Sequence, residues 1–188
     1  MCPRTLSQRR RKLNRKTKRV TLSALLLALM LILGYLESLL PSLSVPGIKL
    51  GLSNSVLLFA IYMLDIPTAF CLMVMKVVLS GMLFGGFSAA MYAFAGGVLS
   101  MTVMCLMSRS KGISPIAVSM TGGVAHNVGQ VALAMVILHT RQLLYYMAVL
   151  MLAGLACGAL TGVCAVQVMK HLKHMKMTES SKKPDKKK

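Results

Sequence analysis

The chain has 188 residues, of which 56 % are hydrophobic and only 14 % are charged, a composition that excludes an ordinary soluble domain and predicts a membrane protein. The net charge of +18 would suit a nucleic-acid-binding protein, but nine of the 22 Lys and Arg residues lie in residues 1–20 and eight in residues 170–188. No aromatic residue interleaves either basic run, so we interpret both as membrane-flanking tails that contact anionic lipid, and not as a nucleic-acid-binding surface.

The first predicted element is a basic cytoplasmic tail at residues 1–20, and an apolar run follows it at residues 21–40. That run is as long as a full membrane crossing, for which about 20 helical residues are needed. No A-x-A-like cleavage site follows it, so we expect a retained span and not a cleaved signal peptide. Apolar and polar residues do not alternate in such runs, which favours helices over a closed β-barrel.

Stretches rich in Pro, Gly and charged residues divide the remaining apolar sequence into five further segments. These are residues 50–64, 67–84, 87–107, 114–138 and 143–169. The first of the five is short for a crossing, and we expect it to be tilted or partly interfacial. The sequence therefore predicts an all-α integral membrane bundle of six transmembrane helices.

The topology follows from the two basic tails. The bundle occupies residues 21–170 and the second basic cytoplasmic tail residues 171–188. An even number of crossings leaves both termini on the cytoplasmic side of the cell membrane. The loop that carries Arg109 then obeys the positive-inside rule, whereas Lys49 and Arg141 are exceptions that face outside.

Small residues at a spacing of four indicate where helices approach closely. Gly154, Gly158 and Gly162 recur on one face of the last span, and Ala24 and Ala28 form a similar pair on the first. Such residues let backbones come together where lipid supplies no hydrophobic driving force, so we expect the glycines to pack within the chain. The five cysteines form no C-x-x-C pair, and we interpret them as buried side chains without a disulfide or metal role.

Polar side chains inside apolar spans are the candidate site residues, because a charge at mid-membrane costs at least about 2.5 to 3.5 kcal/mol and usually faces a partner or a cavity. They are Glu37, Lys49, Asn54, Lys76, His126, Asn127 and Gln130. We expect most of them to converge in the outer half of the bundle as a substrate-binding pocket, beneath the proline-containing connector of residues 41–47. Lys49, at the start of a helix, would attract an anionic or polar group. The alternative is structural: Lys49 extends to the interface and pairs with Glu37, and the asparagines hydrogen-bond across helices.

Missing motifs exclude several activities. There is no G-x-x-x-x-G-K-[ST] phosphate loop, so the chain is not itself an ATPase. The acidic residues are Glu37, Asp65, Glu179 and Asp185. They are not clustered as magnesium-dependent diphosphate chemistry requires. No second ligand lies at metal-binding spacing from His126. We therefore predict no catalytic residue, no metal and no cofactor.

The stretches "GYLESLLPSLSVPGIKLGLSNSVLLFAIY", "KVVLSGMLFGGFSAAMYAFAGG" and "TGGVAHNVGQ" resemble the bacterial family of heptaprenyl diphosphate synthase component I, also called the Gx transporter family. The resemblance covers nearly all of the membrane part. That family is similar in turn to the S components of energy-coupling factor transporters, six-helix membrane proteins that work with a transmembrane T component and two ATPases. In those relatives an A-x-x-x-A motif on the first helix packs on the T component, and the pair of Ala24 and Ala28 matches it.

The two family labels imply different functions. The transporter label implies a substrate-capture subunit of an energy-coupling factor-type importer, which we favour because it accounts for the spans, the absent ATP site and the polar residues together. The synthase label implies a non-catalytic membrane partner of a catalytic prenyl synthase subunit. A third hypothesis is a structural protein that interacts with membrane lipid through its basic tails.

Overall fold

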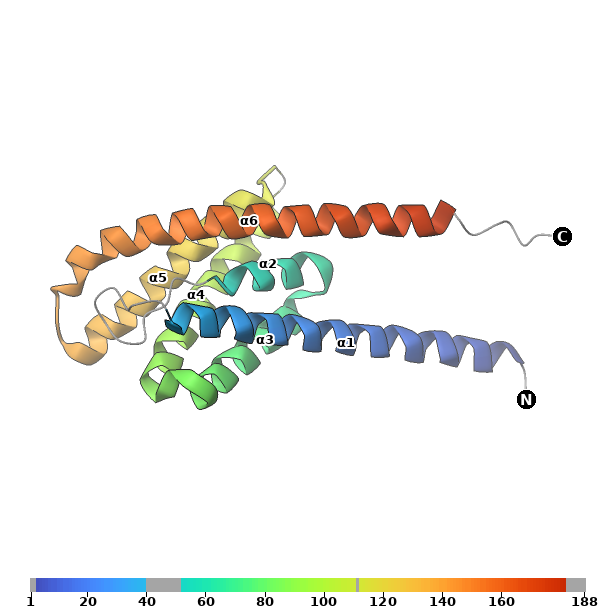
Figure 1. The fold of residues 1–188 in the computed structure, drawn as a ribbon, viewed down its shortest axis with the longest axis horizontal. Helices are drawn as coiled ribbons and strands as arrows, with labels where there is room; N and C mark the ends of the chain where they lie inside the picture. The colour runs from blue at the N-terminus through green and yellow to red at the C-terminus, as the bar shows by residue number, and fades with distance from the viewer. Residues whose placement is uncertain (1–2, 40–51, 111, 182–188) are drawn as a thin grey trace.

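The computed structural model describes residues 3–39, 52–110 and 112–181, and these ranges contain helices and turns without a β-strand (Figure 1). The elements are α1 (Pro3–Leu39), α2 (Asn54–Met63), α3 (Ile66–Ser80), the π-helical segment η1 (Gly81–Gly85), α4 (Gly86–Arg109), α5 (Pro115–Leu138) and α6 (Leu143–Ser181). The all-α class expected from the sequence is confirmed.

Proline and capping residues set the helix ends. Pro67 and Pro115 lie in the first turns of α3 and α5, where the missing N–H is not needed by the helix. Ser114 precedes α5, and its side chain accepts a hydrogen bond of 3.2 Å from the backbone N of Ala117. α5 ends at His139, whose φ of 50° is the left-handed conformation that commonly stops a helix.

Within the part of the chain that the structure describes, four segments are long and apolar enough to cross a membrane. They are Lys16–Leu39, Ile66–Arg109, Pro115–Leu138 and Leu143–His171. The second has 44 residues, about twice what one crossing needs, and it folds back at η1 so that α3 and α4 pack together. The chain thus has the helices of a multi-pass membrane protein. The six separate crossings expected from the sequence need α2 in addition, and α2 has only ten residues.

The short helix α2 lies in the middle of the bundle. It contacts all five of the other α-helices, and Leu57, Leu58 and Ala60 are fully buried in it. A helix of about ten residues that is apolar all round is typical of a core helix. The short segment that we predicted at residues 50–64 thus contains a helix enclosed by its neighbours, and its tilt relative to the membrane stays a prediction.

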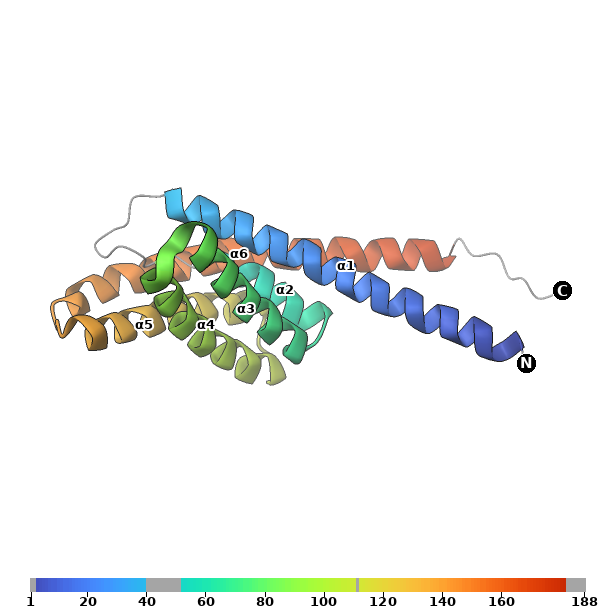
Figure 2. The ribbon, with the colours of Figure 1, turned by 90° about the horizontal axis from the view of Figure 1, so that it is seen from below.

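The start of α1 and the end of α6 lie at the same end of the bundle (Figures 1 and 2). The first half of α1 and the last part of α6 extend beyond the other helices there. The α2–α3 and α4–α5 turns lie toward this end, whereas η1 and the α5–α6 turn lie toward the opposite end. The two basic tails are therefore largely helical continuations of α1 and α6. Hydropathy gave no signal for them, but Lys and Arg are good helix formers.

Glycines bring α5 into backbone contact with both of its neighbours. A Cβ atom added at Gly158 of α6 would lie 2.7 Å from Met120 Cα of α5. On the other side, a Cβ added at Gly129 of α5 would lie 2.9 Å from Gly96 Cα of α4. The remaining two glycines of the predicted stripe on α6 approach α5 in the same way. The packing within the chain that their spacing predicts is confirmed.

The cysteines within the described ranges are free, but they are not all buried as expected. Cys71 and Cys164 are exposed on the outside of the bundle, and Cys105 and Cys157 are half-buried. The expectation of burial was wrong for the exposed pair because a side chain that faces lipid can be as apolar as one that faces the core.

Candidate functional site

Six of the seven polar residues selected from the sequence lie buried inside the bundle, and we call them the polar cluster. They are Glu37 from α1, Asn54 from the start of α2, Lys76 from α3, and His126, Asn127 and Gln130 from α5. None of the six is more than 8 % exposed. The seventh, Lys49, lies outside the described residues, as does the proline-containing connector.

His126 and Gln130 form a hydrogen-bonded pair one turn apart on α5. Their Nε2 atoms are 2.5 Å apart. Because an amide nitrogen can only donate, His126 Nε2 accepts this bond, and the proton of the neutral imidazole lies on Nδ1. The imidazole lies directly against α4, since a Cβ added at Gly96 would be 2.9 Å from His126 Nδ1. Gly96 thus leaves the space that this pair occupies.

Lys76 extends from α3 toward the same region. It interacts electrostatically with His126. Its Cε atom lies 3.8 Å from the position of a Cβ added at Gly34 of α1. The long apolar stem therefore fills the space between α1 and α3, and the ammonium group is held inside the bundle. Lys76, like Glu37 and Gln130, has an interaction partner there, as a charge buried at this depth requires.

Glu37 joins three helices at the far end of α1. Its Oε1 atom accepts a hydrogen bond of 2.5 Å from the backbone N of Leu52, just before α2 begins. It also interacts electrostatically with Cys157 of α6. This carboxylate therefore ties the end of α1 to the residues just before α2.

Asn127 links α5 to α6. Its Nδ2 atom donates a hydrogen bond of 2.6 Å to the carbonyl oxygen of Leu150. The bond requires close approach, because a Cβ added at Gly154 would lie 2.6 Å from the same Nδ2 atom. This is the cross-helix bond that the structural alternative predicts for Asn127. It accounts for the amide nitrogen but not for the amide oxygen.

Several polar atoms of this region have unused hydrogen-bonding capacity. Within the described ranges, Ser53 Oγ, Asn54 Nδ2 and Asn127 Oδ1 are buried without a hydrogen-bond partner. An unpaired buried polar group costs about 1 to 3 kcal/mol, so such groups are rare in native proteins. The set combines an amide donor, an amide acceptor and a hydroxyl. Ser53 was not selected from the sequence, although its place beside Asn54 at a helix start was a signal.

Ala24 and Ala28 lie on the exposed face of α1. Leu25 and Leu29, between and beyond them, are 65 % and 44 % exposed. This face is available to lipid or to a partner helix. The role in partner packing stays a prediction.

Comparison with known proteins gives one match. A family model described as heptaprenyl diphosphate synthase component I matches residues 26–168. The chain belongs to this family. The matched range begins in α1, ends in α6 and contains every residue of the polar cluster. No curated protein and no solved structure matches the chain.

Proposed function

We propose that this member of the heptaprenyl diphosphate synthase component I family is a membrane-embedded, non-catalytic component of polyprenyl diphosphate synthesis. The family match over residues 26–168 is the observation that carries the proposal. The sequence adds that its four acidic residues form no aspartate-rich cluster, whereas diphosphate chemistry with magnesium needs carboxylates close together. We therefore assign catalysis to a separate subunit. The apolar helices place this component in the lipid phase, where a long isoprenoid product also dissolves.

The test is reconstitution of the full chain in lipid with the catalytic prenyl synthase subunit of the same organism. We expect a higher yield of long-chain prenyl diphosphate from labelled isoprenoid diphosphate precursors than the catalytic subunit gives alone. Ala28→Leu changes an exposed face of α1 and tests whether that face contacts the partner. Ala132→Leu on the exposed face of α5 is the matched control. An unchanged product yield and chain length with the native chain would exclude the proposal.

A second candidate function is substrate capture for an energy-coupling factor-type importer, in which the chain crosses the membrane six times as an S component does. The polar cluster supports it, because buried polar atoms with unused hydrogen-bonding capacity are suited to hold a ligand. The exposed pair of Ala24 and Ala28 supports it also, as a face for a T component. In this proposal Glu37, Lys76 and Asn127 contribute to the ligand site.

Co-purification in mild detergent tests this second candidate. We expect a T component and ATPases to accompany the native chain and to be lost from Ala24→Leu and Ala28→Leu. Mass spectrometry of the denatured protein should release a small molecule from the native chain but not from Lys76→Ala at equal expression. Recovery of the native chain without these partners and without a ligand would leave the synthase role alone.

A further inference from the structure

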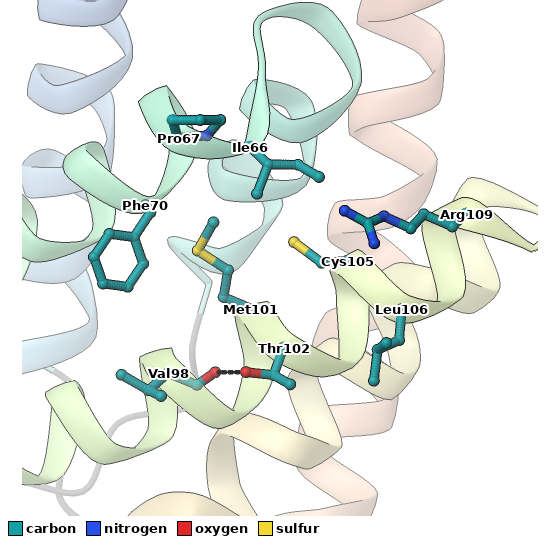
Figure 3. A pocket seen from close by; sticks show the side chains of 9 residues that line it. All are labelled: Ile66, Pro67, Phe70, Val98, Met101, Thr102, Cys105, Leu106 and Arg109. Atoms are coloured by element: carbon teal, nitrogen blue, oxygen red, sulfur yellow. Dashed lines mark hydrogen bonds between the residues drawn. The ribbon is translucent and has the colours of Figure 1, made fainter.

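A groove of about 420 Å³ lies between the start of α3 and the second half of α4 (Figure 3), and its lining residues do not belong to the polar cluster. Its wall on α4 is one helical face, because Val98, Met101, Thr102, Cys105, Leu106 and Arg109 recur at spacings of three and four. At 1.5 Å per residue, the stretch from Val98 to Arg109 is about 16 Å long. Phe70 of α3 forms the opposite wall.

The groove is apolar along its length and basic at one end. Phe70 and Leu106 are 47 % and 65 % exposed, so they leave the groove open to the side of the bundle. Thr102 is no exception to the apolar wall, since its Oγ1 donates to the Val98 carbonyl oxygen at 2.8 Å within the same helix (Figure 3). The guanidinium group of Arg109, in the last turn of α4, lies at the end of the groove.

The nearest carboxylate in sequence to the groove is that of Asp65, which precedes Ile66 at the start of α3. Its Oδ1 atom accepts a hydrogen bond of 2.7 Å from Thr68 Oγ1. This bond uses one of the two carboxylate oxygens and leaves the negative charge in place. Arg109 supplies a cation at the basic end of the groove, and Asp65 adds a modest repulsion toward an anion bound there.

We propose that this groove holds the isoprenoid chain of a prenyl diphosphate, with the diphosphate against Arg109. The inference rests on the proposed role in polyprenyl diphosphate synthesis. The ligand and the groove match from end to end. The ligand is a branched apolar chain that ends in an anion, and the groove is a wall of aromatic, branched and thioether side chains that ends in an arginine. Arg is the side chain best matched to phosphate oxygens, because its planar group donates two parallel hydrogen bonds.

The position of the groove explains why a membrane component would serve a synthase. Arg109 ends the apolar segment Ile66–Arg109, so an anion bound to it lies at the boundary between lipid and water. The chain of the ligand lies along α4 toward the lipid interior. A product held in this way keeps its diphosphate accessible to a water-soluble catalytic subunit while its apolar tail is out of water.

The test uses the full chain in phosphatidylcholine nanodiscs and a farnesyl diphosphate that carries a benzophenone. We expect the probe to crosslink to the α3 and α4 groove. Arg109→Gln should weaken binding about fivefold, since an exposed charge pair contributes at most about 1 kcal/mol. Val98→Trp should abolish binding by filling the groove. Matched controls are Arg141→Gln at the exposed turn before α6, and Val136→Trp on the exposed face of α5.

Three results would overturn the inference. One is an equal affinity of Arg109→Gln and Arg141→Gln for the probe. Another is displacement of the probe by an equimolar amount of phosphatidylglycerol, which would make a phospholipid the occupant. The third is crosslinking to the polar cluster instead. This test can fail independently of the proposed function. Probe binding without any change in the product yield of the catalytic subunit would reject the proposed function. A change in product yield without probe binding would reject only the assignment of the groove as the binding site.

Discussion

Gly158 of α6 faces α5 so closely that a single added methyl group does not fit. A Cβ atom there would lie 2.7 Å from Met120 Cα and 2.8 Å from Ser119 O, and both are backbone atoms that cannot turn aside. Carbon atoms are in favourable contact at about 3.5 to 4.0 Å, so Gly158→Ala must separate the two helices by about 1 Å. Overpacking of this kind costs about 1 to 3 kcal/mol.

Gly34→Ala is the matched control, because the same change at Gly34 meets only ordinary contacts. The added Cβ would lie 3.8 Å from Lys76 Cε and 3.8 Å from Phe84 Cζ. Alanine is favoured over glycine inside a helix by about 0.8 to 1 kcal/mol. We therefore expect Gly34→Ala to leave stability unchanged or to raise it slightly.

Thermal unfolding of the full chain in mild detergent, followed by helical circular dichroism, measures the difference. A change of 1 kcal/mol shifts the midpoint by about 2 to 4 °C in a protein of this size, so Gly158→Ala should unfold about 2 to 12 °C lower than the native chain. A native midpoint for Gly158→Ala, or an equal loss in Gly34→Ala, would refute the argument that backbone contact between α5 and α6 limits the side chain at Gly158.

Three further predictions concern topology, the polar cluster and the outer face of α1. In a chain without native cysteines, Gln142→Cys and Ser110→Cys should react with an impermeant thiol reagent from opposite sides of the membrane, and labelling from one side would exclude the six-crossing topology. Asn127→Ala removes the bond to Leu150 and should cost about 0.6 to 1.7 kcal/mol, seen as a lower unfolding midpoint. Ala28→Leu, on an exposed face, should unfold like the native chain; a clear loss of stability would show that this face is packed within the chain.

The sequence predicted where helices begin more accurately than how far they continue. Pro67 and Pro115 gave the starts of α3 and α5 to within a residue, because proline has a fixed place in a helix. The continuation of α6 to Ser181 gave no signal, since a basic helix outside the membrane has no apolar periodicity. The enclosed position of α2 was also hidden, because a helix that faces protein on all sides and one that faces lipid are equally apolar.

For the candidate site, the sequence predicted which polar side chains are buried but not which hydrogen-bond partners they have. The cost of a polar group in lipid is enough to turn Lys76, His126 and Asn127 inward. The partner of Asn127 is the Leu150 carbonyl, 23 positions away, and this choice depends on how α5 and α6 rotate against each other. The groove beside Arg109 could not be found from the sequence, because the residues that line it have the same apolar character as any surface that faces lipid.

The lengths of the first and last helices have a consequence at the end of the bundle where α1 begins and α6 ends. With 37 and 39 residues, α1 and α6 measure about 55 and 58 Å, some 25 Å more than the hydrocarbon core of a bilayer. The surplus forms two positively charged rods that extend beyond the other helices at this end of the bundle (Figures 1 and 2). A water-soluble protein that docks on this end must carry an acidic surface between the rods, and its attachment should weaken as ionic strength rises.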